Sequence, residues 1–121
     1  MTEYEIHLDD KYGQSNLIDI QAEIAAAGDA WFNQTLTTVN ESVVRLGVIE
    51  GDFHWHKHIG EDEFFLVLDG ELLIDLDGGD TVTLKRHQGY TVPRDVVHRT
   101  RAPRRTAILM VESAEVAPTG D

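Results

Sequence analysis

The sequence predicts an all-β fold, a closed or two-sheet barrel with one short helix near the N-terminus. From Trp31 onward, apolar and polar residues alternate with a period of two, in short runs broken by Gly, Asp and Asn. About eight such runs favour a barrel, because closing the sheet leaves few exposed edges. The chain has 121 residues, of which 41% are hydrophobic, so a single domain over residues 1–121 can bury a core.

One helix is predicted over residues 16–27. Its apolar positions recur at spacings of three and four residues, and Gly28 can end it. These positions are Leu17, Ile20, Ile24 and Ala27. Residues 1–30 are therefore expected to form an arm of strand and helix ahead of the barrel.

Tight turns predict how the strands are joined. The two-residue turn Asp69-Gly70 favours a hairpin, and Gly78-Gly79-Asp80 favours a second one. The mostly small and polar tail, residues 114–121, is expected to be loosely held. Strands are predicted at 32–39, 42–49, 53–58, 64–68, 71–77, 81–85, 90–92, 97–101 and 106–112.

The charge balance and the absence of cysteine narrow the function. Ten Lys and Arg against 22 Asp and Glu give a net charge of −12, which argues against a nucleic-acid partner. The sequence has no apolar segment of about 20 residues and no basic, apolar leader at its start, so we expect a soluble cytoplasmic protein with no membrane partner. Because Cys is absent, a metal would have to be held by His and carboxylates.

Residues 53–63, Phe-His-Trp-His-Lys-His-Ile-Gly-Glu-Asp-Glu, carry the densest chemistry. On a strand, His54, His56 and His58 would share one face, while Phe53 and Trp55 would point away from them. The carboxylates that follow, at positions 61–63, begin the next strand. Such a set suits Fe(II), Mn(II), Ni(II), Co(II) or Zn(II), although a solvated His-rich sheet edge is the simpler interpretation of a lone His-x-His pair.

The spacing of this region and of a later one resembles the two motifs of the cupin superfamily. The resemblance covers residues 47–111 and implies a jelly-roll barrel, also called a double-stranded β-helix. It implies that His56, His58, Glu63 and His98 bind one divalent transition metal, Fe, Mn, Zn, Ni or Co. The positions that carry the resemblance are His56, His58, Glu63 and Gly70 in the first motif and Gly89, Pro93 and His98 in the second.

The sequence also departs from the family pattern. Gly51 stands four residues before His56, where the family usually leaves five, so the turn into that strand is expected to be shorter or shifted. The leading glycine of the second motif is replaced by His87, and Gly89 can relocate that turn. Asp95 replaces a later glycine and tolerates a left-handed conformation. Ala102 stands in the closing Asn position.

The resemblance implies a range of activities and does not choose among them. The leading hypothesis is a metal-dependent dioxygenase, isomerase or lyase that acts on a small oxygen-rich or carboxylate compound. The alternatives are a non-catalytic module that binds or senses a small ligand, and a mainly structural dimer. The expected partners are thus a small molecule and a second copy of the chain.

His54 points inward by strand parity, two residues before the first ligand. It is a candidate for contacting substrate or transferring a proton, and otherwise it packs inside the barrel. In a second register, His54, His56 and Glu61 would be the ligands, but Gly70 would then lose its expected spacing. His7 and His87 are expected at the surface.

Two further features bear on partners. Arg99, Arg101, Arg104 and Arg105 could hold an anionic substrate, or they could pair with the abundant carboxylates of the same chain. Aromatic residues on the outer sheet face would favour a homodimer by covering an apolar surface. The candidates for that surface are Trp31, Phe53 and Trp55.

Overall fold

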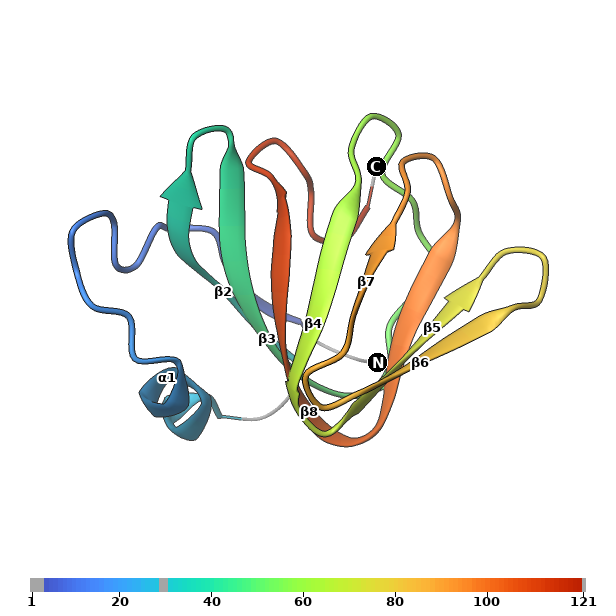
Figure 1. Cartoon of the computed structure of the whole chain (residues 1–121), viewed down its shortest axis with the longest axis horizontal. Helices are drawn as coiled ribbons and strands as arrows, with labels where there is room; N and C mark the ends of the chain where they lie inside the picture. Colours follow the sequence, from blue (N-terminus) through green and yellow to red (C-terminus); the bar gives the residue numbers. More distant parts are fainter. Residues whose placement is uncertain (1–3, 29–30, 121) are drawn as a thin grey trace.

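Eight strands and one helix make up the part of the chain that the structure, a computed structural model, describes: residues 4–28 and 31–120. Figure 1 shows the strands curled into a barrel-like sheet, with the helix beside β2. This confirms the all-β class with a short N-terminal helix. The elements are β1 (Glu5–His7), α1 (Ile20–Ala26), β2 (Phe32–Val39), β3 (Ser42–Asp52), β4 (Glu63–Asp69), β5 (Glu71–Leu76), β6 (Thr81–Lys85), β7 (Gly89–Val92) and β8 (His98–Ser113).

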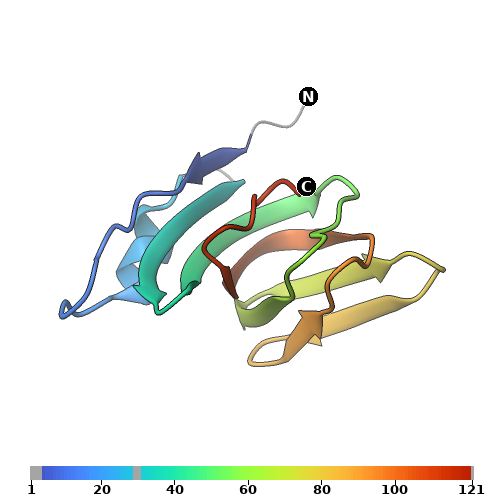
Figure 2. The same ribbon diagram turned by 90° about the horizontal axis from the view of Figure 1, so that it is seen from above.

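β8 is the strand that ties the barrel together. Its C-terminal half pairs with both β3 and β4, and its N-terminal half pairs with β5. The strand order is β1-β2-β3-β8-β4-β7, with the β5–β6 hairpin attached through β8. Figure 2 shows β5, β6 and β7 lying together on the side of β8 away from the helix.

The two strands predicted at 97–101 and 106–112 are a single strand, so that division was wrong. Ala102 pairs with Gly51, and Thr106 pairs with Ile49, so the ladder to β3 continues on both sides of residues 103–105. Those three residues bulge outward and are exposed. Their Pro-Arg-Arg sequence therefore marks a bulge and not the end of a strand.

The helix is shorter than predicted because its first residue is set by a cap. The Asp19 side chain accepts a hydrogen bond from the Ala22 amide at 3.0 Å, so the helix begins at Ile20 and not at residue 16. Leu17 is consequently outside the helix and 91% exposed. The apolar side of α1 packs on the outer face of the sheet, where it covers Leu36, Leu46 and Val48.

Residues 53–58 do not form the predicted strand. β3 continues to Asp52 through Gly51, and the chain then runs beside β8 with one isolated bridge, between His56 and His98. Backbone hydrogen bonds hold this crossing, from Phe53 N to Thr100 O at 2.9 Å and from His98 N to His56 O at 2.8 Å. Without a continuous ladder, side chains in this segment do not have to alternate between two faces.

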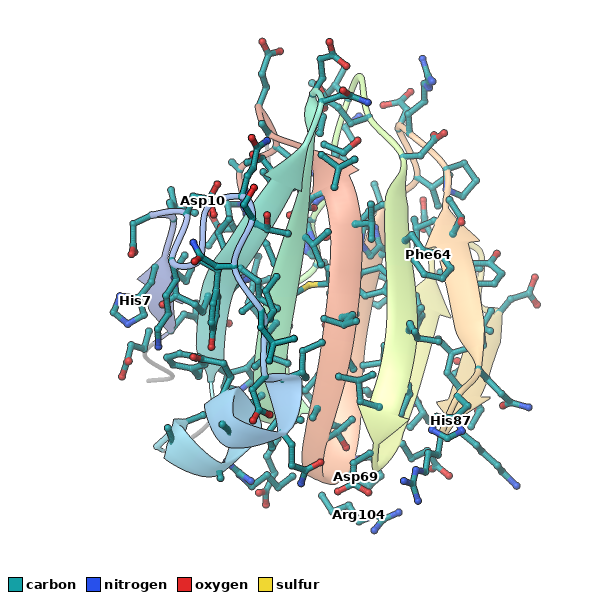
Figure 3. All side chains as sticks on the ribbon, turned by 60° about the vertical axis from the view of Figure 1, so that its left-hand side comes forward. His7, Asp10, Phe64, Asp69, His87 and Arg104 are labelled. Carbon is teal, nitrogen blue, oxygen red and sulfur yellow. The ribbon has the colours of Figure 1, made fainter. Side chains whose placement is uncertain are left out.

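The hairpin predicted at Gly78-Gly79-Asp80 is confirmed, since β5 pairs with β6. The hairpin predicted at Asp69-Gly70 is wrong, because β4 pairs with β7 and β8 whereas β5 pairs with β6 and β8, so this turn carries the chain from one set of strand partners to another. A glycine is nevertheless required in that turn. Gly70 has φ +97°, and a Cβ atom there would lie 2.3 Å from Thr106 Oγ1 and 2.9 Å from Thr106 Cα. Asp95 has φ 64° and His87 has φ 67°, so both adopt the left-handed conformation that glycine would otherwise supply. Figure 3 shows His87 at the surface, beyond the end of β6, as predicted.

No helix in the described ranges is long and apolar enough to cross a membrane.

Candidate metal centre

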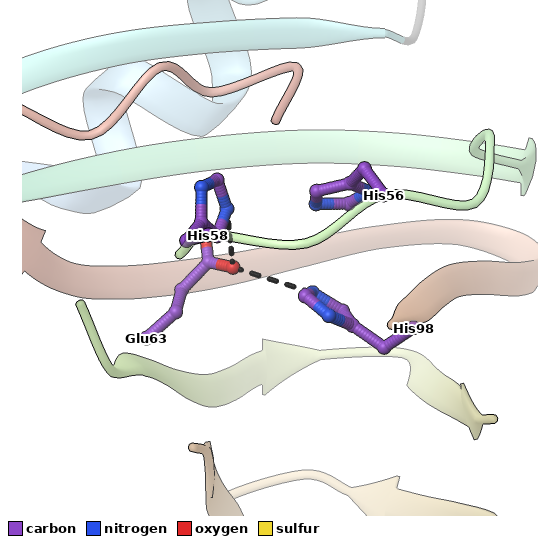
Figure 4. Close-up of side chains that lie close together, drawn as sticks. All are labelled: His56, His58, Glu63 and His98. Carbon is purple, nitrogen blue, oxygen red and sulfur yellow. Dashed lines mark ion pairs between the residues drawn. The ribbon is translucent and has the colours of Figure 1, made fainter. Parts of the chain in front are cut away.

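Three separate parts of the chain bring His56, His58, Glu63 and His98 together (Figure 4). The first two lie in the segment after β3, Glu63 opens β4, and His98 opens β8. One ligand atom from each side chain lies within 4.8 Å of those of the others. Three of the four residues are buried, and His56 is half-buried. The sequence-predicted set is therefore one cluster.

Backbone hydrogen bonds orient two of the imidazoles. His56 Nδ1 lies 3.0 Å from the carbonyl of His54, and His98 Nδ1 lies 2.9 Å from the carbonyl of Val96. A carbonyl only accepts, so each Nδ1 carries the proton and donates it. Each Nε2 is then left with a free lone pair directed to the cluster, which is how metal-binding histidines are usually held.

The cluster contains buried polar atoms that make no hydrogen bond: Nε2 of His58, Nε2 of His98 and Oε1 of Glu63. Glu63 Oε1 lies 3.3 Å from His58 Nε2 and 3.5 Å from His98 Nε2. With its proton on Nδ1, His98 presents the Nε2 lone pair to the carboxylate, so two hydrogen-bond acceptors face each other. Such buried groups are costly unless a proton or a cation lies between them, and three imidazoles with one carboxylate suit a divalent transition metal.

The electrostatics keep His56 and Glu63 in the protonation states that coordination requires. Burial lowers the pKa of His56 to about 4, against the hydrogen bond to His54, so this imidazole is neutral at pH 7. Burial would raise the pKa of Glu63, but its interactions with His58, His98 and Glu112 outweigh burial and hold the pKa below its usual range. A neutral imidazole and an ionised carboxylate can both donate to a cation.

A buried ion pair lies directly behind Glu63, and sequence reasoning missed it. Glu112 on β8 is opposite Glu63 in the sheet, and Arg45 Nη1 on β3 lies 3.1 Å from Glu112 Oε1, with both side chains at most 3% exposed. Burial and the negative charge of Glu63 raise the pKa of Glu112, and the Arg45 guanidinium opposes this rise by favouring the ionised carboxylate. The available signal was two charges at inward positions of otherwise apolar strands.

His54 lies outside the cluster, and its predicted inward position is wrong. It is exposed, stacks on Phe53 with ring centroids 4.3 Å apart, and lies 5.3 Å from the His56 ring. Its Nε2 is 2.6 Å from the carbonyl of Thr119, and its Nδ1 is 3.3 Å from the Tyr4 hydroxyl. The second register, with His54 and Glu61 as ligands, does not match the cluster that the described residues form.

Phe53 points into the barrel, so its predicted outward orientation is also wrong. It lies 5.2 Å from the His56 ring and packs against Trp31, which is only 9% exposed. Trp55 does face outward, at 48% exposed, with the Arg99 guanidinium 5.2 Å from its ring. Phe53 turns inward because the chain has left the β3 ladder before this residue.

The C-terminal tail packs closely against this region, although its composition predicted loose attachment. Val116 is 4% exposed, and Gly120 lies against the side chain of His56. The hydrogen bond from His54 to Thr119 fastens the same segment.

The arginine cluster pairs with groups of its own chain. Arg99 and Arg101 contact Asp75 at 2.9 and 2.7 Å, and Arg101 holds the pKa of Asp75 below its usual range against the effect of burial. Arg105 donates to the carbonyls of Ile24 and Ala27 at the end of α1. These contacts favour the intramolecular interpretation over an anion site.

An interior cavity of about 50 Å³ adjoins His56 and Glu63. Tyr4, Trp31 and Phe53 form an aromatic wall, with ring centroids 4.5 to 5.7 Å apart. The strands contribute apolar side chains to the same lining, namely Ile49, Phe65, Ile108 and Met110. The cluster therefore meets a partly open and mostly apolar pocket.

A barrel of this topology with three imidazoles and a carboxylate inside defines a class, and residues 42–112 match the cupin domain family. The chain belongs to that family. It is 41% identical over 97 residues to an uncharacterized protein, YdbB of Bacillus subtilis. The aligned residues cover 80% of this chain and 83% of YdbB.

Solved structures give the same fold. A cupin-2 domain protein of Shewanella frigidimarina has a TM-score of 0.76 at 27% identity, covering 80% of this chain and 94% of its own. Protein NMB1881 of Neisseria meningitidis has a TM-score of 0.74 at 22% identity, and the match covers 81% of this chain and 99% of NMB1881.

Proposed function

We propose that the protein is a metal-dependent enzyme whose metal is bound by His56, His58, Glu63 and His98. The observation that carries this proposal is the set of buried, unpaired donor atoms that face one another. A divalent Fe, Mn, Zn, Ni or Co ion held by four protein donors would supply Lewis-acid or redox chemistry at its remaining positions. The reaction classes that we propose are dioxygenase, isomerase or lyase chemistry on a small oxygen-rich or carboxylate compound.

The chain's own residues would support such chemistry in three ways. The carbonyls of His54 and Val96 fix the tautomers of His56 and His98, so both imidazoles present Nε2. The apolar wall of the cavity covers one side of the site. His54, whose Nδ1 lies near the Tyr4 hydroxyl, is the candidate for moving a proton or contacting substrate from the exposed side.

Binding without turnover is the second candidate, and the composition of the cavity favours it. Among the described lining residues outside the cluster, polar groups are carried by Glu5, Asn33 and Thr100, together with the Tyr4 hydroxyl and the Trp31 indole N–H. A reaction that needs several proton transfers would have few groups to use there.

Metal analysis of chains purified without a His tag tests the metal site. We expect about one transition metal ion per chain, a large loss in His58→Ala, and full retention in His87→Ala, which removes an exposed histidine. Equal metal content in the two variants would overturn the proposal. Turnover of a substrate found by screening, and its loss in His54→Ala with metal retained, would favour the enzyme over the binding module.

We also propose a homodimer, on a surface different from the predicted one. Trp31 and Phe53 lie inside, so they cannot cover an outer face. The outer faces of β3, β4 and β8 carry an apolar stripe beyond the area that α1 covers, and Phe64 is seen there in Figure 3. The stripe consists of Val44, Phe64, Leu66 and Val111, and Leu109 lies at its border with the area that α1 covers. The cytoplasmic location stays a prediction.

A further inference from the structure

The wall of the interior cavity restricts what kind of molecule can lie beside the cluster. Phe53 connects the two, since it contacts His56 on one side and the Tyr4 and Trp31 rings on the other. Ile108 and Met110 close the opposite side, next to Gly47, where an added Cβ would lie 3.1 to 3.2 Å from them. The space beyond His56 is thus apolar on several sides.

The polar groups on the wall are few. Thr100 is buried at 6% exposure, and Asn33 Oδ1 is a buried acceptor without a hydrogen-bond partner. Asn33 lies on β2, two strands away from β8 and three from β4, which carries Glu63. Glu5 is exposed, and the Tyr4 hydroxyl lies near His54. A ligand that reached along the cavity would meet the cluster at one end and mainly apolar side chains elsewhere.

An apolar group of a ligand would bind against this wall much more tightly than a hydroxylated group. Each CH₂ group buried in such a space strengthens binding about fourfold. Each hydroxyl that loses water without gaining a partner weakens binding by about fivefold to a hundredfold. A volume of about 50 Å³ accommodates only a few water-sized groups, so the favoured group is short.

We propose that the ligand of this site is a small carboxylic acid with a short apolar group, and not a sugar or polyhydroxylated acid. The carboxylate lies at the cluster, and the apolar group fills the cavity against Tyr4, Trp31 and Phe53. The position of the ligand's carboxylate rests on the proposed function. The position of its apolar group rests on the cavity alone. Of the oxygen-rich compounds and the carboxylates named in the proposed function, this inference selects the carboxylates.

Two hydroxamates with the same metal-binding head and tails of similar size test the apolar end. 2-Methylbutanohydroxamate carries methyl groups at the two positions where 2,3-dihydroxypropanohydroxamate carries hydroxyls. In calorimetric titrations of the metal-loaded protein we expect the first to bind at least about tenfold more tightly. Equal affinities, or tighter binding of the hydroxylated compound, would overturn the inference.

Matched variants assign the preference to the cavity wall. Phe53→Ala should reduce the ratio of the two affinities to less than about threefold, because the apolar tail loses its contact with the ring. Phe64→Ala removes the same side chain from the outer face of β4 and should leave the ratio unchanged. A ratio that falls equally in both variants would contradict a role for the wall, and so would one that falls in neither.

A metal-free titration separates this inference from the proposed function. In a Trp55→Phe background, Trp31 is the remaining tryptophan and reports on the cavity by its fluorescence. Isobutanol should perturb this signal at lower concentration than glycerol does. If the protein binds no metal but shows this difference, the metal proposal fails and the apolar cavity stands. If it binds metal but shows neither this difference nor the hydroxamate preference, only the present inference fails.

Discussion

Glu63 is held between two histidines in front of it and a buried ion pair behind it. The Arg45 and Glu112 side chains place charges at fixed positions beside Glu63, because all three side chains are almost inaccessible to solvent. Buried pairs contribute little when compared with an apolar replacement, but breaking one by removing a single partner is costly. The effects of Arg45 and Glu112 on stability therefore depend on each other.

Removing only the arginine should be strongly destabilising. Arg45→Leu leaves Glu112 buried near the Glu63 carboxylate, and we expect a loss of about 3–5 kcal/mol in the free energy of unfolding. The double variant Arg45→Leu/Glu112→Leu should recover most of that loss. Urea denaturation measures both, with Arg94→Ala as the control, since its pair with Asp62 is exposed and worth about 0–1 kcal/mol. A cost for Arg45→Leu as small as the control would contradict the account.

The depressed pKa of His56 predicts how the stability of the metal-free protein depends on pH. Below about pH 6.5 the unfolded chain takes up a proton at this imidazole, whereas the folded chain does so only near pH 4. The neutral His56 side chain therefore makes its full contribution to the free energy of unfolding above pH 6.5. This contribution, about 3 kcal/mol in total, is lost as the pH falls toward 4. The groups that face His56 are the His54 carbonyl, His58, Glu63 and His98.

Comparison with a variant isolates this contribution. The difference in unfolding free energy between the wild type and His56→Gln, both metal-free, should decrease between pH 6.5 and 4, because the variant lacks the titrating group. Taking the difference cancels the opposing effect of Glu112, which has a raised pKa. A difference that stays constant over this pH range would contradict a neutral, desolvated His56.

At the scale of elements, sequence patterns gave the regular parts correctly and failed where tertiary pairing decides. The strands at 32–39 and 81–85 agree with β2 and β6, because alternation and turn residues act locally. The segment 53–58 also alternates, yet its partner β8 bonds to it at only one bridge, and no local signal shows this. The strand parity that placed Phe53 outside therefore did not apply.

The turn between β4 and β5 gives a prediction for the same scale. Gly70→Ala should cost about 2 kcal/mol or more, because the residue has φ +97° and its Cβ would collide with Thr106. Gly60→Ala is the matched control, since it has no strained φ and no atom within 4 Å of the added Cβ, and it should change stability by less than about 0.5 kcal/mol. Similar melting temperatures for the two variants would contradict the assigned turn geometry.

For the whole molecule, motif spacing was enough to gather His56, His58, Glu63 and His98, but the surroundings of the cluster were not predictable. The resemblance to the two cupin motifs implied that His98 joins the other three, which lie close together in the sequence. The aromatic wall combines Tyr4, Trp31 and Phe53 from three distant segments, so it follows only from how the strands close. The Arg45–Glu112 pair has the same origin.

The outer apolar stripe predicts association of two chains. Light scattering at micromolar concentration should give twice the 13.6 kDa chain mass, and Val111→Lys should shift it toward the monomer because a charge enters the centre of the stripe. Lys57→Glu, on the segment after β3, serves as a charge-changing control and should remain dimeric. A wild-type mass near 13.6 kDa would contradict the dimer.

X-ray absorption of the metal-loaded protein tests the central claim most directly, because it reports the atoms bound to the metal without a known substrate. The account predicts one type of site with about three imidazole nitrogens and one carboxylate oxygen at roughly 2.0–2.2 Å, distances ordinary for such ligands. In His98→Ala the imidazole scattering should fall by about one third in any metal that remains bound. A wild-type spectrum with oxygen neighbours only and no imidazole scattering would contradict the site.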